Sequence, residues 1–154
     1  MAKHIEKTKY RFEYKDRTIE GVMELDLGRF EGQYSRAQYE LDSMVMTSMI
    51  PFMPKDTGTF INVTQGMSQS IAGSGTVVAA APPMGRFLYE GEVMVGTTSR
   101  SAFAMKGEKK VATGKRLQYS AHANPKATDH WFDAAKDAHG KAWVKKTKQL
   151  AGGG

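Results

Sequence analysis

Hydrophobic and polar positions alternate strictly near the start of the chain, as in a strand with one buried face. The aromatic positions of this pattern are Tyr10, Phe12 and Tyr14. Residues 15–17 are typical of a turn, and residues 18–25 predict a second strand. We therefore expect a β-hairpin, preceded by a polar and mobile segment over 1–7.

From about residue 26 the apolar positions recur at helical spacing instead of at every second residue. They fall at steps of three, four or one, which places them on a single helix face. Asp26 is a residue type that caps helix N-termini, and Pro51 cannot continue a helix. We expect one amphipathic helix over 26–50. Its apolar positions are Phe30, Tyr34, Ala37, Leu41, Met44, Val45 and Met49.

The stretch over 51–60 separates this helix from the rest of the chain. Pro51 and Pro54 lack the backbone N–H that a helix interior needs. Asp56 is a residue type that bonds back to nearby backbone in turns, and Gly58 permits a positive φ. We expect a helix stop, an extended step and a tight turn, with Gly58 at a positive φ.

Short apolar runs separated by glycines follow, which is the pattern of antiparallel strands joined by tight turns. We expect such strands over 59–81. Pro83 at a first helical position and Gly91 after the last one predict a short helix over 84–90. Residues 93–95 then return to strand.

The segment over 97–116 is polar, contains glycine and has a net charge of +5, against +6 for the whole chain. A long segment without secondary structure is unusual in a compact domain unless it is functional or disordered. We expect an extended arm that contacts DNA phosphates or an acidic protein ring, while a solvated mobile loop stays an open alternative. The candidate contact residues are Arg100, Lys106, Lys109, Lys110, Lys115 and Arg116.

The last part of the chain predicts a strand over 117–121 and a helix over 128–149. Thr128 is a favourable N-cap for this helix, and residues 151–154 are expected to form a flexible tail. Large aromatic residues on the helix are expected to be largely buried. They are Trp131, Phe132 and Trp143.

Together these elements predict an α+β fold in a single domain over 1–150. A small antiparallel sheet would be packed by the long helix over 26–50 and by the C-terminal helix, with 97–116 as the extended arm. The sequence contains no cysteine, which excludes disulfides and thiol chemistry. No apolar run approaches the ~20 residues that span a bilayer, and the first residues lack an apolar signal core, so we expect neither a membrane span nor a signal peptide.

Three residue combinations suggest chemistry, and each has a simpler explanation. The triplet over 56–58 occurs in aspartic proteases, but those enzymes need two carboxylates that share a proton, so a turn explains Asp56 better. The glycines around residue 74 precede a strand-like run rather than the helix that a phosphate cradle needs. A possible metal set lies on one face of the last helix, but it includes no Cys and no His pair at i and i+4. Its members are His130, Asp133 and Asp137. We expect no catalytic, metal or cofactor site.

Three motifs resemble a family of small phage minor capsid and tail-completion proteins, and they occur in the family's order. Residues 51–60 (PFMPKDTGTF) resemble its "VP-x-D-T-G-x-L" signature after a helix. Residues 86–91 (RFLYEG) resemble its "Y-A-x-Y-L-Y-x-G" segment, and residues 131–136 (WFDAAK) resemble its C-terminal "W-F-E-x-A-K" helix. The resemblance depends on the ordered set, which covers roughly residues 30–149.

The resemblance implies a non-enzymatic structural protein of a tailed-phage virion, made in the host cytoplasm. Such a head–tail connector or tail-completion subunit forms a homo-oligomeric ring, a hexamer, in contact with neighbouring neck and tail proteins. Viral DNA would pass through the ring and is therefore a candidate partner, whereas no membrane and no cofactor is implied. Two alternatives stay open, namely a small basic nucleic-acid-binding module outside a virion and an enzyme with an unrecognised site.

Overall fold

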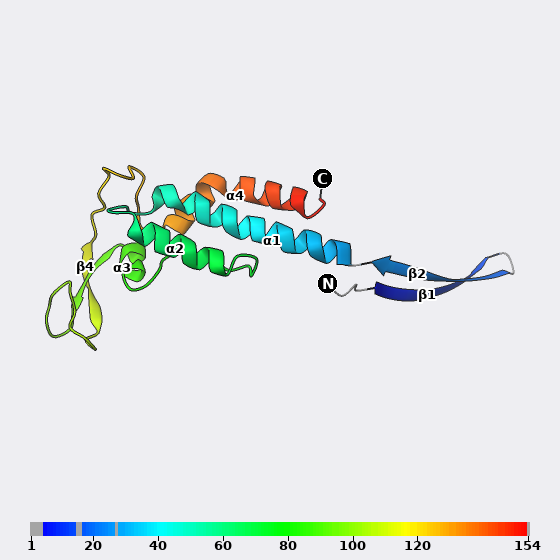
Figure 1. Cartoon of the computed structure of the whole chain (residues 1–154), viewed down its shortest axis with the longest axis horizontal. Coiled ribbons are helices and arrows are strands. Elements are labelled where there is room, and N and C mark those ends of the chain that lie inside the picture. The colour runs from blue at the N-terminus through cyan, green and yellow to red at the C-terminus, as the bar shows by residue number, and fades with distance from the viewer. Residues whose placement is uncertain (1–4, 15–16, 27, 154) are drawn as a thin grey trace.

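The computed structural model describes residues 5–14, 17–26 and 28–153. Three helices lie side by side in the middle of an elongated molecule, with a β-hairpin at each end (Figure 1). The mixed α+β class that we expected is confirmed. The elements in chain order are β1 (Ile5–Tyr14), β2 (Arg17–Asp26), α1 (Gly28–Met49), the short 3-10 helix η1 (Ile50–Phe52), α2 (Thr59–Ser70), α3 (Gly85–Glu90), β3 (Glu92–Gly96), β4 (Lys110–Arg116) and α4 (Trp131–Leu150).

The predicted N-terminal hairpin is confirmed by the antiparallel pairing of β1 with β2. The register pairs Ile5 with Asp26 at one end and Tyr14 with Arg17 at the other. The ribbon projects from the N-terminal end of α1, away from the other helices (Figure 1). The predicted turn residues 15–16, and residues 1–4 of the segment expected to be mobile, lie outside the described residues, whereas residues 5–7 belong to β1.

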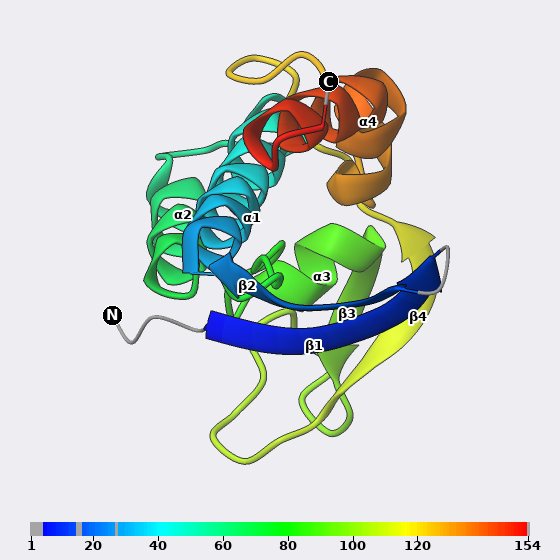
Figure 2. The same ribbon diagram turned by 90° about the vertical axis from the view of Figure 1, so that its right-hand side faces the viewer.

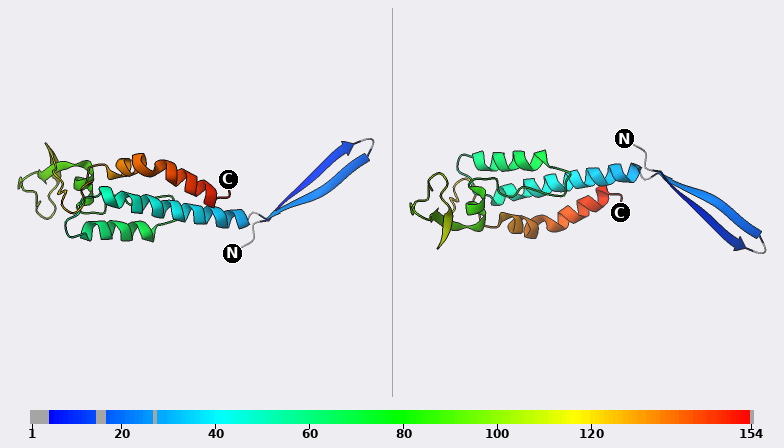
Figure 3. Two further views of the ribbon diagram at one scale, coloured as in Figure 1. Left: turned by 90° about the horizontal axis from the view of Figure 1, so that it is seen from above. Right: turned by 90° about the horizontal axis from the view of Figure 1, so that it is seen from below.

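The core forms where α1 packs against both α4 and α2, so the long helices pack on one another rather than on a central sheet. α1 lies between its two partners (Figure 3), and α3 and the β3–β4 hairpin are grouped on one side of them (Figure 2). Trp131 and Trp143 are buried as expected, whereas Phe132 is only partly buried and stacks on Trp143 with ring centroids 6.4 Å apart. The buried cluster contains Val45, Met46, Met49, Met53, Ile61, Trp131, Ala135 and Trp143.

The prediction of strands over 59–81 is wrong, because the first half of this segment is α2. Its β-branched residues favour strands in isolation, but the buried positions of α2 recur at three and four residues and pack against α1. The second half contains an irregular run, residues 76–81, which we call the strap. The buried α2 residues are Ile61, Thr64 and Ser68.

Side chains hold the strap in place, where a β-sheet would use backbone pairing. The Ser68 hydroxyl donates to the Val78 carbonyl at 2.8 Å and accepts from the Val78 N–H at 2.9 Å. The Thr64 hydroxyl accepts from the Ala81 N–H at 3.2 Å while donating to a carbonyl of its own helix. The backbone groups of Val78 and Ala81 are thereby paired with side chains of a helix rather than with a neighbouring strand.

The proline-rich stretch joins α1 to α2 as a stop and a turn, as predicted. Pro51 lies in η1, and Pro54 follows it in irregular structure. Asp56 is exposed in the turn, and Gly58 is the N-cap of α2 with φ = 91°, which confirms the expected positive φ. The amide of Asn124 bonds two carbonyls of this region at 3.1 and 2.8 Å and so fixes it from the other end of the chain.

We expect Gly58→Ala to lower the free energy of unfolding by about 1–2 kcal/mol, the cost of a left-handed conformation for an L-residue. A Cβ built there would meet its nearest neighbour at an ordinary 3.6 Å, so conformation rather than crowding sets the effect. Gly66→Ala is the matched control, because it lies within α2 with no atom within 4 Å of the added Cβ and should stabilise by roughly 0.5–1 kcal/mol. Urea unfolding measures both, and equal signs would contradict the prediction.

Three further expectations for the C-terminal part are corrected. Residues 117–121 are not a strand, because Leu117 donates its N–H to Gly91 and the chain then leaves the β3–β4 sheet. α4 begins at Trp131, with His130 rather than Thr128 at its N-cap. Residues 151–153 are not a free tail, since the N–H groups of Gly152 and Gly153 bond helix carbonyls in the pattern of a Schellman cap.

The predicted short helix is confirmed as α3 and the predicted strand after it as β3. Gly85 lies where α3 begins, and a Cβ there would approach the Ala80 carbonyl carbon to 2.5 Å, so this position requires glycine. Within the described residues, no helix combines the length and the apolar character that a bilayer crossing requires.

Candidate functional site in the β3–β4 hairpin

The segment that we expected to be an extended arm belongs to a β-hairpin. β3 and β4 pair antiparallel with Gly96 opposite Lys110, and a register shift lies between Glu92 and Met94. The arm prediction is therefore wrong for residues 110–116, which form β4, and the connecting loop covers 97–109. Alternation is weak in this strand, which explains why the sequence did not reveal it.

Glu108 organises this loop by accepting three backbone hydrogen bonds with one carboxylate. Its Oε1 accepts from the N–H groups of Thr98 and Ser99, each at 2.6 Å, and its Oε2 accepts from Met105 at 2.8 Å. These backbone donors, with that of Ser99 contributing most, lower the pKa of Glu108 to about 2. The single acidic residue among six cations thus shapes the loop instead of merely reducing its charge.

Gly96 makes room for this carboxylate at the base of the loop. A Cβ built on Gly96 would overlap Oε1 of Glu108 and Oγ of Ser99. The Gly96 N–H bonds the Ser101 carbonyl at 2.9 Å, and its own carbonyl accepts from Arg100 at 3.1 Å. A side chain at position 96 would therefore displace the Glu108 carboxylate from its place at the base of the loop.

Two of the six predicted contact residues are engaged within the domain. Lys110 donates from Nζ to the Ala102 carbonyl at 2.6 Å and lies over the Phe87 ring, 4.3 Å from its centroid. Arg116 forms an ion pair with Asp129 at 3.2 Å. These contacts tie the hairpin to itself, to α3 and to the start of α4.

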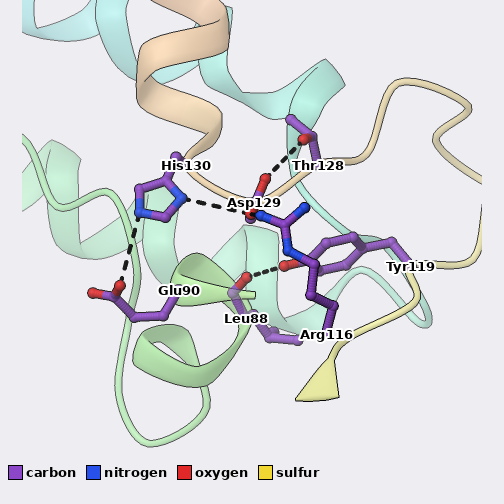
Figure 4. Close-up of polar contacts among 7 residues, drawn as sticks. All are labelled: Leu88, Glu90, Arg116, Tyr119, Thr128, Asp129 and His130. Atoms are coloured by element: carbon purple, nitrogen blue, oxygen red, sulfur yellow. Dashed lines mark hydrogen bonds and ion pairs between the residues drawn. The ribbon is translucent and has the colours of Figure 1, made fainter. Parts of the chain in front are cut away.

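The Arg116 contact belongs to a polar cluster at the start of α4, which Figure 4 shows. The other oxygen of Asp129 accepts from the Thr128 hydroxyl at 3.2 Å. Nε2 of His130 lies 3.7 Å from a carboxylate oxygen of Glu90, and Nδ1 of His130 lies 3.7 Å from a carboxylate oxygen of Asp129. His130 is therefore held at the helix terminus, outside the helix face that the sequence suggested it shares with two aspartates.

The other four predicted contact residues are exposed on the hairpin: Arg100, Lys106, Lys109 and Lys115. Arg100 has a positive φ of 54° in the loop. The sequence did not indicate that the apolar members of the same surface are exposed, because a single Phe and a single Met form no periodic pattern. Phe103 is 89% exposed and Met105 is 70% exposed. We call residues 100–106 the loop tip.

The triplet that suggested an aspartic protease lies in a turn, in which Asp56 is exposed. Among the described residues, no group of three or more His, Asp or Glu side chains is placed to hold a metal ion. Asp42 is buried, and its carboxylate accepts from Gln38 at 2.8 Å and from the N–H groups of Gly73 and Gly75 at 2.7 and 3.1 Å.

Acidification is expected to release the loop only near pH 2. Because folding lowers the pKa of Glu108 from 4.5 to about 2, its ionised form stabilises the loop above pH 4.5, and this contribution is lost as the pH falls through about 2. Amide proton shifts of Thr98 and Ser99 in an NMR titration measure this. In Glu108→Gln they should already be displaced at pH 7, and a wild-type midpoint near 4.5 would contradict the prediction.

The hairpin is thus the part of the molecule where charge, exposed apolar area and local order coincide. Its loop is fastened at the base by Glu108 and Gly96, and its tip presents Phe103 and Met105 among cations. This arrangement suits binding rather than acid–base chemistry. Comparisons of the chain with protein-family models, curated proteins and solved structures find no match.

Proposed function

We propose that this protein is a non-enzymatic structural subunit in the neck of a tailed-phage virion. Copies of it form a closed ring that joins head and tail around the DNA channel. The proposal rests on the resemblance of three separate motifs to minor capsid and tail-completion proteins. The structural support for it is that the three motifs contact one another in the fold.

One ring from each motif contributes to a single aromatic cluster. The Trp131 ring lies 5.9 Å from that of Phe60 and 4.8 Å from that of Tyr89, both edge to face. Phe60 comes from the proline motif, Tyr89 from the second motif and Trp131 from the third. Segments spaced across more than half of the chain are therefore parts of one structural unit, as a shared family fold would require. This convergence is the observation that carries the proposal.

The shape of the molecule suits a ring. An elongated body with a hairpin at each end (Figure 1) offers two different surfaces at its two ends. Contacts between unlike surfaces generate closed rings when the rotation between copies closes. The outer face of α2 adds exposed Val63 and Met67, and α1 adds exposed Phe30 and Tyr34. These apolar side chains would be covered by neighbours in an assembly.

A second candidate function is a basic nucleic-acid-binding module outside a virion, which the charge of +5 over 97–116 favours. A dedicated binder should hold duplex DNA as the free protein, with an affinity that falls steeply as salt is raised. A neck subunit should bind duplex DNA weakly before assembly. Fluorescence anisotropy with a labelled duplex at two salt concentrations distinguishes the two functions.

The test of the proposed function is a variant that lacks the loop but keeps the hairpin. The Thr97 N–H bonds the Lys109 carbonyl at 3.0 Å, so these residues can flank a two-residue Asn-Gly turn that replaces residues 98–108. We expect this protein to fold and melt normally. In a phage that carries it, heads and tails should accumulate unjoined.

The control is the same phage with Gly66→Ala, a change that adds one methyl group to an open helix position. Electron microscopy of the lysates counts joined particles, free heads and free tails. Infectious particles assembled normally from the loop-replaced protein would refute the role of the loop. Absence of the wild-type protein from purified particles would refute the function itself.

A further inference from the structure

We propose that the loop tip is a docking plug for a protein of a different kind, whose receiving surface is an apolar pocket edged by carboxylates. This inference rests on the proposed function, in which the partner is another protein of the neck. It adds the chemistry of the partner and the residues that bind it. Phe103 and Met105 are the anchors, with Arg100, Lys106 and Lys109 around them.

The anchors are identified by exposure in an ordered loop. Phe103 and Met105 are the two most exposed large apolar residues of the described chain, at 89% and 70%. Neighbouring backbone groups are nevertheless bonded, with the Phe103 N–H on the Ser101 hydroxyl at 3.1 Å and the Met105 N–H on Glu108. The loop thus holds both side chains in solvent. Aromatic residues, Met and Arg are the types enriched at protein–protein interfaces.

The hydrogen bonds that hold the loop favour binding without a change in its conformation. Glu108 fixes both sides of the loop through Ser99 and Met105, and Lys110 donates to the Ala102 carbonyl next to Phe103 within the loop tip. A loop that is already ordered loses less conformational freedom on binding. The anchors would therefore enter their pocket with little rearrangement.

The positive charge around the loop tip predicts negative charge at the rim of the partner's pocket. Arg100, Lys106 and Lys109 are exposed. The nearby carboxylate of Glu108 is directed at backbone N–H groups of its own loop. Carboxylates around the pocket would complement this surface, and they would also select against basic partners.

The same residues argue against DNA and against a second copy. Lys110 and Arg116 contact groups within the domain, which leaves fewer free cations for phosphates, and Phe103 is the single aromatic residue of the segment 97–116, so base stacking is poorly supported. The segment carries +5 of the chain's net +6, which leaves +1 for the rest of the chain. Another copy therefore offers no net negative charge to complement the loop tip.

Photo-cross-linking in assembled particles tests the inference. Phe103→p-benzoylphenylalanine is introduced into the full-length protein in the phage, and Tyr34→p-benzoylphenylalanine, on the exposed face of α1, is the matched control. Irradiation should link position 103 to one other virion protein. Mass spectrometry should place the link beside apolar residues and within a cluster of Asp and Glu. The control position should not give this product.

Charge reversal then tests the rim. Combining Arg100→Glu, Lys106→Glu and Lys109→Glu should reduce the yield of this cross-link roughly tenfold or more, as loss of complementary charge around a hot spot predicts. A product with DNA, a product with a second copy, or no product would overturn the inference while the protein is present in the particles. Absence of the protein from purified particles, measured by immunoblot, would overturn the proposed function together with the inference.

Discussion

Replacing Trp131 by alanine is expected to lower the free energy of unfolding by about 3–5 kcal/mol. Trp131 is fully buried, at 0% exposure, and contacts the rings of Phe60 and Tyr89. Its Nε1–H also donates to the Ala79 carbonyl in the strap at 2.8 Å. The change therefore leaves a cavity among α1, α2 and α4 and one partly buried carbonyl without its donor. Urea unfolding followed by circular dichroism measures the loss.

Trp131→Phe separates the two contributions. Phenylalanine keeps much of the aromatic contact but cannot donate to the Ala79 carbonyl, so part of the loss is the cost of about 1–3 kcal/mol for an unsatisfied buried group. A phenylalanine variant as stable as the wild type would show that this hydrogen bond contributes nothing to the strap. An alanine variant within about 1 kcal/mol of the wild type would contradict the assignment of Trp131 to the core.

The second large effect is expected from Asp42→Ala, which should destabilise the protein by roughly 3–5 kcal/mol, because hydrogen bonds to a charged group are each worth about 1.5–3 kcal/mol. Asp42 is 4% exposed, and its Oδ2 accepts from the N–H groups of Gly73 and Gly75. The alanine variant leaves both donors without this acceptor and frees the loop between α2 and the strap.

The control for this change is Asp42→Asn, which keeps an acceptor oxygen of similar position. The Gln38 amide can reverse and accept from the new NH₂ group, so we expect a smaller loss than for alanine. Hydrogen exchange at Gly73 and Gly75 gives a local readout. Unchanged protection of these two amides in the alanine variant would contradict the proposed anchoring.

The spacing of hydrophobic residues was sufficient to predict α1. It did not show how much of the apolar face of this helix is buried by other segments. Phe30 and Tyr34 share the apolar spacing of Val45 and Met49, yet they are 48% and 60% exposed. The difference arises because the buried cluster draws on the C-terminal half of α1. Which part of an amphipathic face is covered depends on partner segments distant in sequence, and a local pattern contains no information about them.

The segment over 59–81 shows a different limit. Its valines and threonines are typical of short strands, and its glycines of the turns between them. The segment instead forms a helix and a strap, in which Thr64 and Ser68 supply hydrogen bonds that a neighbouring strand would otherwise supply. These side chains are four residues apart on one helix face, a spacing that is visible in the sequence. Its meaning depends on where the strap runs, which is a tertiary property.

The charge of the segment 97–116 was sufficient to locate the candidate site, but the sequence did not show which interactions hold its loop in place. Composition alone located the six cations of 97–116, whereas the importance of Glu108 depends on turns that bring Ser99 and Met105 to one carboxylate. The sequence contained one indication of this role, namely a single acidic residue, Glu108, in a basic segment that begins after a glycine, Gly96. The exposure of Phe103 became visible only in three dimensions.

The pairing of α1 with α4 also sets the order of events during synthesis. α1 emerges from the ribosome early, while Trp131 and Trp143, which cover its Met49 end, belong to the last helix. Until α4 has been translated, the apolar face of α1 can pack against α2 but lacks the cover that α4 provides. The helical body therefore closes after most of the chain has been made, and in the interval a chaperone has access to a nascent helix that the folded protein hides.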